Sequence, residues 1–176
     1  ARERCMRLAD APRQQNMAMI ALITLMMLPA GGGLEARAQT VSGDAYILDG
    51  DTLEIDGTRV RLSGIDAPEM EQVCRHASGR RYRCGAMAKR ALIDRVAGQR
   101  LSCRPESTDR YGRQIATCFL GRQNLNAWMV RQGWAIAYRR YSTEYVGAEN
   151  RARRARRGIW SGSFEKPWRW RRKQER

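Results

Sequence analysis

Residues 41–69 read VSGDAYILDGDTLEIDGTRVRLSGIDAPE. Runs rich in apolar and β-branched residues are separated here by Asp-Gly pairs at 49–50 and 56–57. Such a pair between strand-like runs is a strong hairpin signal, because both residues tolerate the positive φ of a tight turn. The stretch therefore predicts a meander of three antiparallel strands, over residues 41–48, 51–55 and 58–65.

Two carboxylates of this meander, Asp51 and Asp66, follow the first turn and end the third strand. Adjacent strands bring them together, where they repel each other unless a cation or a proton lies between them. Hard divalent ions prefer such oxygen ligands. Arg61 can balance phosphate charge, and Pro68 directs Glu69 outward as a base for water. We interpret the stretch as a metal-assisted site for phosphodiester cleavage.

Ordinary turn chemistry is the alternative for these aspartates, because Asp beside Gly often bonds its own local backbone. We prefer that interpretation for Asp49 and Asp56. For Asp51 and Asp66 we prefer the metal site, because an arginine and a third carboxylate accompany them.

Three motifs follow one another along the chain: DGDT at 49–52, RLSGIDAPE at 61–69 and DRYGR at 109–113. Their order and spacing resemble three signatures of the thermonuclease, or staphylococcal-nuclease-like, family. Residues 125–133 resemble that family's second helix, and residues 157–160 resemble the end of its third. The resemblance covers about the whole chain from Val41 to Trp160.

The resemblance implies one calcium ion. Its ligands would be the carboxylates of Asp51 and Asp66 and the main-chain carbonyl of Ala67. The family usually has threonine where this chain has Ala67, but an alanine can supply the same backbone ligand.

The resemblance also implies the catalytic side chains. Glu69 would act as general base or orient the attacking water, and Arg61 and Arg113 would grip the scissile phosphate. The chemistry of these groups agrees, because a planar fork of donors suits a phosphate whose equatorial oxygens gain charge.

Charge and aromatic content favour nucleic acid as the substrate. The chain carries 33 Lys and Arg against 18 Asp and Glu, a net charge of +15. Such charge attracts nucleic acid or an anionic membrane alike. Aromatics interleaved with arginines at 138–141 favour a single strand with stacking bases. The resemblance places Arg110, Tyr111 and Tyr138 near the nucleotide, so we expect DNA and RNA, preferably single-stranded, and no obligate protein partner.

Residues 17–28, MAMIALITLMML, form an apolar run too short to span a bilayer comfortably. Arg13 precedes the run, and the small-x-small pattern at 36–38 suits signal peptidase. We predict that residues 1–38 are a signal peptide or leader, and that the protein is exported, periplasmic or secreted. An uncleaved membrane anchor is the alternative.

The cysteines agree with export. Of five cysteines, one lies in the predicted leader. An even number remains, which predicts two disulfides in an oxidising compartment. Three pairings are formally open, and we favour the local ones, Cys74 with Cys84 and Cys103 with Cys118. A zinc site is the alternative, but neither pair has the close spacing of zinc knuckles.

The rest of the chain completes one domain over residues 39–160. Apolar stripes predict helices over 85–97, 124–132 and 144–157. Strands, a helix, two more strands and two helices predict an α+β fold, a five-stranded OB-type β-barrel with three packed α-helices. The basic, Trp/Arg-rich tail at 161–176 could stack on bases, pack on the barrel or touch anionic lipid. Membrane contact is expected only through the leader or this tail.

The leading hypothesis is an exported, calcium-dependent endonuclease or phosphodiesterase, which the resemblance implies would leave 3′-phosphate ends. The alternatives are a noncatalytic OB-type nucleic-acid-binding module and a cationic surface-adhesion protein. The complete set of three carboxylates and two arginines favours the enzyme. The single histidine, His76, excludes nucleases that use paired histidines or histidine-rich zinc sites.

Overall fold

The computed structural model describes residues 39–176. The predicted leader over residues 1–38, which contains Cys5 and the signal-peptidase pattern at 36–38, lies outside the described residues. The strands of the main sheet are β1 (Val41–Gly43), β2 (Ala45–Ile47), β3 (Thr52–Ile55), β4 (Thr58–Leu62), β8 (Leu101–Thr108), β9 (Gln114–Leu120) and β10 (Gln123–Asn124).

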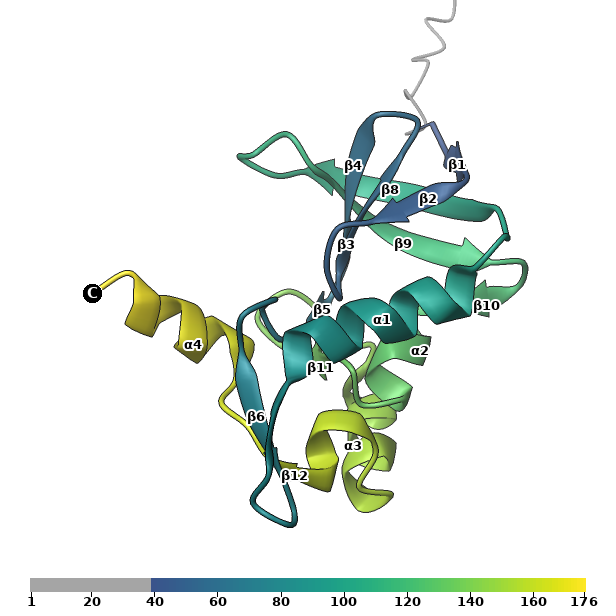
Figure 1. The fold of residues 1–176 in the computed structure, drawn as a ribbon. Coiled ribbons are helices and arrows are strands. Elements are labelled where there is room, and N and C mark those ends of the chain that lie inside the picture. Colours follow the sequence, from purple (N-terminus) through teal and green to yellow (C-terminus); the bar gives the residue numbers. More distant parts are fainter. Residues whose placement is uncertain (1–38) are drawn as a thin grey trace, which may run out of the picture. The chain divides into compact units, whose positions relative to one another are not determined.

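The main sheet is curled into an OB-type barrel, in the order β1-β8-β9-β4-β3-β2, with β10 paired to β9 (Figure 1). Because β1 and β2 are consecutive halves of one strand, their pairing with β8 and β3 closes the sheet on itself. Counted this way, and leaving out the short β10, the sheet has the five strands that the sequence predicts.

The predicted meander is confirmed, with two corrections to its boundaries. The first strand is interrupted at Asp44. The preceding Gly43 lies where a Cβ would be 2.7 Å from Cγ2 of Ile55, so the backbone passes there only without a side chain. The third strand stops at Leu62, because Gly64 turns the chain with a φ of 70°. The turn at 56–57 has positive φ at both residues, as its Asp-Gly sequence predicts.

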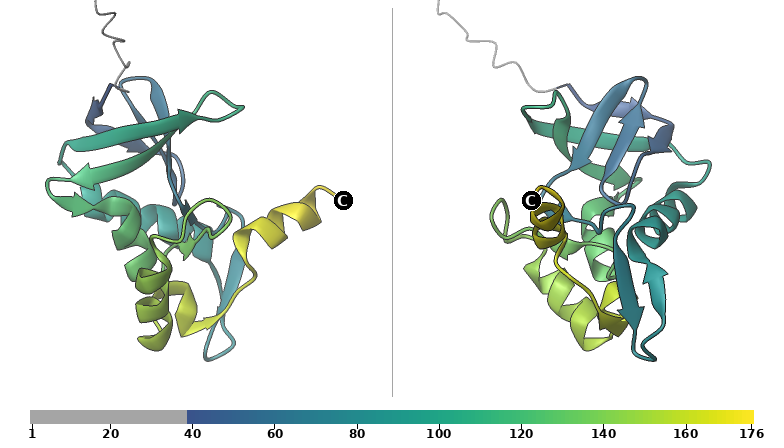
Figure 2. Two further views of the ribbon diagram at one scale, coloured as in Figure 1. Left: turned by 180° about the vertical axis from the view of Figure 1, so that it is seen from behind. Right: turned by 60° about the vertical axis from the view of Figure 1, so that its left-hand side comes forward.

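The helices are α1 (Cys84–Val96), α2 (Leu125–Arg131), α3 (Val146–Arg154) and α4 (Pro167–Gln174), with a short 3-10 helix, η1 (Gly158–Ser161). The first three are the predicted helices, although α3 is shorter than residues 144–157. The tail adds α4, which the sequence analysis did not assign. Both views of Figure 2 show the curled strands at one end of the domain and α3 at the other.

The main core lies between the barrel, α1 and α2. Its apolar side chains are fully buried, and each stabilises the fold by about 1.5 to 3 kcal/mol relative to an exposed position. They include Leu53, Val60, Leu92, Leu125 and Met129. The apolar stripe that predicts α1, Ala88, Leu92 and Val96, is buried and faces this core.

Two smaller sheets lie beside the main sheet, and one of them joins the start of the tail to the domain. One pairs β5 (Ile65–Asp66) with β11 (Ile136–Ala137), and the other has the order β12-β6-β7, with β6 (Val73–His76), β7 (Arg81–Arg83) and β12 (Gly162–Ser163). A second apolar cluster beside the latter contains Ile136 and Ile159, with Phe164 and Trp168 of the tail packed against it. The tail is thus part of the folded unit.

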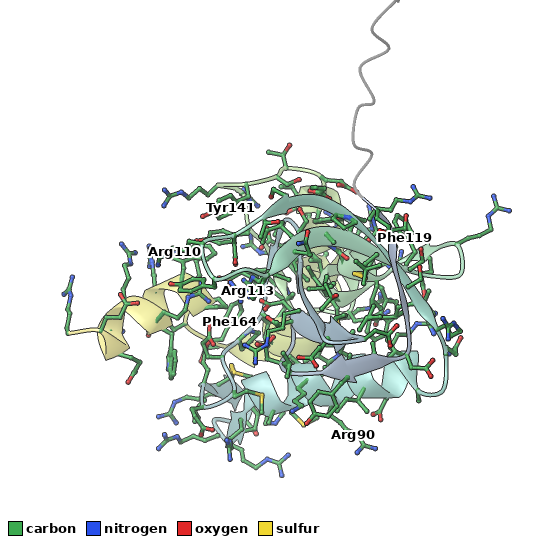
Figure 3. The ribbon with its side chains drawn as sticks, turned by 90° about the horizontal axis from the view of Figure 1, so that it is seen from above. Arg90, Arg110, Arg113, Phe119, Tyr141 and Phe164 are labelled. Atoms are coloured by element: carbon green, nitrogen blue, oxygen red, sulfur yellow. A yellow bond between two sulfur atoms is a disulfide. The ribbon has the colours of Figure 1, made fainter. Side chains whose placement is uncertain are left out.

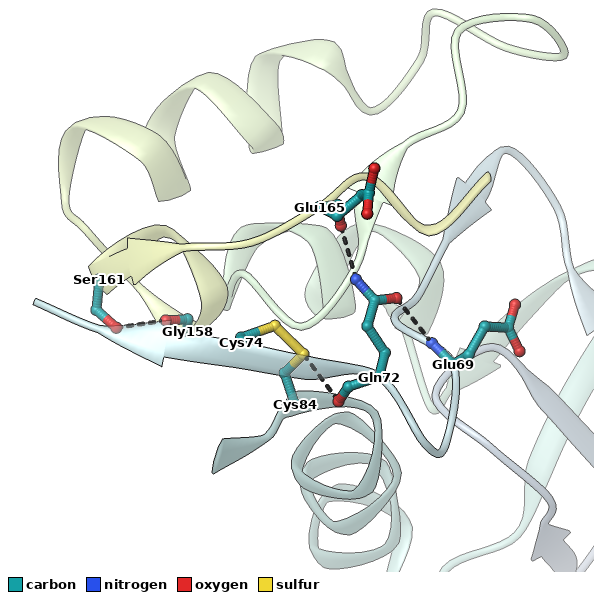
Figure 4. The surroundings of a disulfide bond; sticks show 7 residues. All are labelled: Glu69, Gln72, Cys74, Cys84, Gly158, Ser161 and Glu165. Carbon is teal, nitrogen blue, oxygen red and sulfur yellow. Dashed lines mark hydrogen bonds between the residues drawn. A yellow bond between two sulfur atoms is a disulfide. The ribbon is translucent and has the colours of Figure 1, made fainter. Parts of the chain in front are cut away.

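Both predicted disulfides are present. Cys103 and Cys118 are directly paired residues of β8 and β9, so this bridge clamps the barrel hairpin. Cys74 and Cys84 join β6 to the start of α1 (Figure 4). The zinc alternative is therefore wrong for these cysteines.

Among residues 39–176, no helix is long and apolar enough to cross a membrane.

Candidate active site

Asp51 and Asp66 lie together, as the strand meander predicts. Asp51 precedes β3 and Asp66 ends β5, and their exposed fractions are 2% and 0%. Arg61 of β4 lies between them, since its guanidinium binds Oδ1 of Asp51 through Nη1 and Oδ1 of Asp66 through Nη2, the latter at 3.1 Å. One guanidinium therefore balances two buried carboxylates.

The segment after Asp66 is fixed by Asp51. The backbone N–H of Ala67 donates to Oδ2 of Asp51 at 2.7 Å. Small residues allow this approach, because a Cβ at Gly50 would lie 2.7 Å from Cβ of Ala67 and 2.9 Å from Cβ of Ala88. The alanine at position 67 thus packs where the first turn meets α1.

Asp49 has the turn role that the sequence predicts, because its Oδ1 accepts the backbone N–H of Asp51 at 2.8 Å. Burial and the neighbouring charge of Asp51 raise the pKa of Asp49 to about 7. Burial also raises the pKa of Asp66, against the lowering effect of Arg171. For Arg61, burial lowers the pKa, but the charges of the aspartates prevail and raise it. The carboxylates are thus crowded enough for bound cations to stabilise them.

The oxygen donors of Asp51, Asp66 and Ala67 suit the expected divalent ion. Within residues 39–176, no group of three or more His, Cys, Asp and Glu side chains is arranged to hold a metal. The expected ligands are two carboxylates and one main-chain carbonyl, so only two side chains are required. Their oxygen chemistry, burial and mutual repulsion fit a hard divalent cation.

Glu69 lies beside Asp51 and Asp66. Its backbone is fixed by Gln72 and by the start of α1 at Gly85. Its N–H donates to Oε1 of the buried Gln72 at 3.2 Å, and Nε2 of Gln72 donates to the carbonyl of Glu165 at 2.7 Å (Figure 4). A Cβ at Gly85 would overlap the carbonyl oxygen of Glu69, so α1 begins tightly against this segment. The Glu69 side chain is 33% exposed, which leaves it accessible to water.

The sequence analysis missed one residue of this site, Arg171 of α4. Its Nη1 donates to Asp66 at 3.0 Å and to Glu69 at 2.6 Å, and its Nη2 donates to the other oxygen of Asp66 at 3.2 Å. Burial lowers the pKa of Arg171, but hydrogen bonds and charge from Asp66 and Glu69 prevail and raise it. The only signal in the sequence is the Trp/Arg-rich tail, which does not reveal which arginine turns inward.

Arg113 is not among the groups that contact these carboxylates. Its guanidinium pairs with Asp109 at 2.7 Å, and the Asp109 carboxylate also accepts the N–H groups of Tyr111 and Arg113. Because Ile115 of β9 pairs with Arg61 of β4, Arg113 lies just before the strand that neighbours Arg61. The expected convergence of Arg113 on the site therefore requires a change of partner.

The predicted substrate-binding residues form two groups. The guanidinium of Arg110 lies 4.7 Å from the ring centre of Tyr111, which is 68% exposed. In the view of Figure 3, Arg110, Arg113 and Tyr141 lie on the same side of the molecule as α4. Tyr138 stacks parallel to Trp168, with ring centres 5.4 Å apart. Trp168 is a second contact that the sequence analysis left open.

Comparison with known sequences decides the family. The family described as Staphylococcal nuclease homologue matches residues 59–162. The chain belongs to the staphylococcal nuclease family. The match includes Arg61, Asp66, Glu69 and Arg113, while Asp51 precedes it and α4 follows it.

Several relatives of this family member are similar over most of its length. Succinoglycan biosynthesis protein ExoI of Rhizobium meliloti (strain 1021) is 36% identical, over 90% of this chain and 82% of the relative. Micrococcal nuclease of Shigella flexneri is 34% identical, over 86% of this chain and 88% of the relative. An uncharacterized endonuclease of Escherichia coli O157:H7 is 35% identical, over 71% and 80% of the two chains.

Proposed function

We propose that this protein is a nuclease that hydrolyses phosphodiester bonds of DNA and RNA with the help of a divalent cation. One observation carries the proposal: the buried pair Asp51 and Asp66, bridged by Arg61, lies beside an accessible Glu69. Membership of the staphylococcal nuclease family supports it, as does the similarity to the micrococcal nuclease of Shigella flexneri.

Asp51, Asp66 and the main-chain carbonyl of Ala67 would hold the cation, since hard oxygens suit a divalent ion. We propose calcium, as the family resemblance implies. A divalent ion there would polarise a phosphate oxygen and lower the pKa of nearby water. Arg61 already lies between the two carboxylates and can direct its remaining donors toward a phosphate.

Glu69 is the group that we assign to the water. Its carboxylate is accessible, and its backbone is fixed through Gln72. A water that attacks phosphorus gives its proton to Glu69, while the bond to the leaving oxygen breaks and that oxygen takes up a proton from solvent water. If the bond to O5′ breaks, the product ends in a 3′-phosphate, as the family resemblance implies.

Two arginines would change partners during this reaction. Arg113 would leave Asp109 to reach the phosphate, and Arg171 would release Oε1 of Glu69. The side chains of Arg113 and Arg171 are 26% and 32% exposed. Each guanidinium can therefore exchange a carboxylate for a phosphate while it stays in contact with water, so its charge is never buried without a partner.

We further propose that the nuclease acts outside the cytoplasm. The disulfides Cys74–Cys84 and Cys103–Cys118 support an oxidising compartment. The predicted leader over residues 1–38 supports periplasmic or secreted location. Single strands are the preferred substrate in this proposal, since stacked and exposed aromatics accompany the arginines.

The proposal is tested by incubating the purified protein with single-stranded DNA, with RNA and with duplex DNA, in calcium or in chelator. We expect calcium-dependent cleavage with 3′-phosphate ends, fastest on single strands. Binding without cleavage across calcium, magnesium and manganese would instead support the noncatalytic OB-type module.

A further inference from the structure

A groove of about 720 Å³ lies between α4 and the segment that follows β11. We call it the α4 groove. Its lining combines aromatic rings with cations and includes Tyr138, Arg140, Trp160, Lys166, Trp168 and Arg172. Residues 167–174 of its α4 wall lie beyond the segment that the family match covers.

The aromatic rings form a row along and beyond this groove. Trp168 and Tyr138 are nearly parallel, at an interplanar angle of 5°. The edge of Tyr138 meets Tyr141, with ring centres 4.8 Å apart, and Tyr141 is 70% exposed. The row therefore ends on an uncovered ring that a base can stack against.

The charge of the α4 groove suits a polyanion. Glu149 neutralises Arg139 at 2.8 Å. Arg140, Lys166 and Arg172 are exposed and make no ion pair within residues 39–176. The ammonium of Lys166 lies 5.1 Å from the Trp168 ring centre, so a cation and a stacking surface occur together. Alternating rings and cations are the pattern by which proteins bind single strands without reading their sequence.

The α4 groove is continuous with the candidate active site through Arg171. This residue lines the groove and also binds Asp66 and Glu69. A strand whose phosphate lies at the carboxylate pair can therefore extend into the groove without crossing the barrel.

We infer that the α4 groove binds the nucleotides of a single strand that flank the bond to be cleaved. Bases stack on the outer faces of the row formed by Trp168, Tyr138 and Tyr141, and Lys166 and Arg172 contact phosphates. The inference rests on the proposed function and goes beyond it, because it assigns the tail a role in substrate binding.

The first test measures the affinity for fluorescent oligothymidylates of two and twelve nucleotides in chelator, where cleavage does not interfere. Trp168→Leu retains apolar packing but removes the ring, and we expect about tenfold weaker binding of the twelve-mer. The loss for the two-mer should be smaller, and Trp168→Phe should recover most of the affinity. Tyr46→Leu, which removes an exposed aromatic outside the α4 groove, is the matched control and should bind as wild type does.

The second test measures how the affinity for the twelve-mer depends on salt. The double variant Lys166→Gln/Arg172→Gln should reduce the slope of log Kd against log salt by about 1.4, since each phosphate contact to a single strand contributes about 0.7. The double variant Arg100→Gln/Arg122→Gln removes the same charge outside the groove lining and should leave the slope nearer the wild-type value.

The outcomes separate the inference from the proposed function. Wild-type cleavage with equal twelve-mer affinity in Trp168→Leu would overturn the inference and leave the nuclease intact, provided that thermal unfolding shows the variant folded. Failure of the wild type to bind or cleave any nucleic acid would overturn the proposed function. If Trp168→Leu and Lys166→Gln/Arg172→Gln bind the twelve-mer as wild type does but no longer bind phosphatidylglycerol vesicles, the α4 groove binds a membrane surface. That result would overturn the inference.

Discussion

Arg61 and Arg171 hold the same carboxylate from two regions of different construction. Arg61 extends from β4 of the closed barrel and is 16% exposed, while Arg171 extends from the surface helix α4 and is 32% exposed. Arg61 touches Asp51 and Asp66, whereas Arg171 touches Asp66 and Glu69. The barrel thus holds the carboxylate pair, and the tail holds the carboxylate that we assign to water.

The largest expected effect comes from the barrel. Arg61→Ala leaves Asp51 and Asp66 buried together without their shared partner, which should destabilise the fold by about 3 to 5 kcal/mol. Urea unfolding followed by circular dichroism measures this loss. Arg61→Lys keeps the charge but cannot contact both aspartates in the same way, so its stability should lie between those of wild type and Arg61→Ala. Equal stability of Arg61→Ala and wild type would show that this bridge does not support the barrel.

The two disulfides sharpen the comparison, since Cys103–Cys118 lies within the barrel and Cys74–Cys84 lies near the tail. Each closes a short loop, so removing either should cost about 3 kcal/mol. Their effects on α4 should differ. Hydrogen exchange of residues 167–174 should rise after Cys74→Ser/Cys84→Ser but not after Cys103→Ser/Cys118→Ser. The same rise in both double variants would contradict a separate link to the tail.

Arg171 of the tail should contribute less to the free energy of unfolding than Arg61 does, and its main effect should be on the affinity for calcium. Arg171→Ala should cost about 1 kcal/mol or less, because the contact is partly exposed. The affinity for calcium should rise by up to about tenfold, since the guanidinium no longer occupies Asp66 and Glu69. Isothermal calorimetry measures this affinity directly. Arg172→Ala is the control, and an unchanged calcium affinity in Arg171→Ala would separate Arg171 from the cation site.

The smallest effect concerns the turn at 109–113, where Asp109 pairs with Arg113 rather than with Arg61 or Arg171. Burial alone would raise the pKa of Asp109, but hydrogen bonds from Arg113 and Tyr111 prevail and lower it. A lowered folded pKa gives stability that is present above the unfolded value of about 3.9 and is lost as pH falls through the folded value.

Melting temperatures of wild type and Asp109→Asn should therefore differ above about pH 4 and converge below it. Asp94→Asn, which removes an exposed partner of Arg90 on α1, is the matched control. A difference between Asp109→Asn and wild type that stays constant with pH would show that the Asp109 charge is not its cause.

Local sequence signals predicted the barrel well. The Asp-Gly turn at 56–57, the apolar stripe of α1 and the disulfide pairings all depend on residues close in the sequence, and all are confirmed. The Asp-Gly pair at 49–50 also lies between two strands, but without the positive φ of a tight turn. The interruption of the first strand at Asp44 was not predicted, because no Pro or Asp-Gly turn signal marks that residue as a break. Asp51 and Asp66 lie together, as the predicted meander requires, and Arg61 contacts both.

The tail could not be predicted in the same way. Its position depends on the bond from Gln72 to Glu165 and on the stacking of Trp168 against Tyr138, both between residues far apart in sequence. Several arginines of the tail have equal chemistry, and only the direction of α4 turns Arg171 toward Glu69. For Arg113, the nearby Asp109 provides a local partner that the motif comparison did not consider.

The most direct test of the central claim is the cleavage rate of Glu69→Gln on single-stranded DNA in calcium, with Glu71→Gln as the neighbouring control. We predict that Glu69→Gln loses about 10² to 10⁴-fold in rate while still binding the strand, and that Glu71→Gln stays within about twofold of wild type. Cleavage by Glu69→Gln at the wild-type rate would contradict the assignment of this carboxylate to the attacking water.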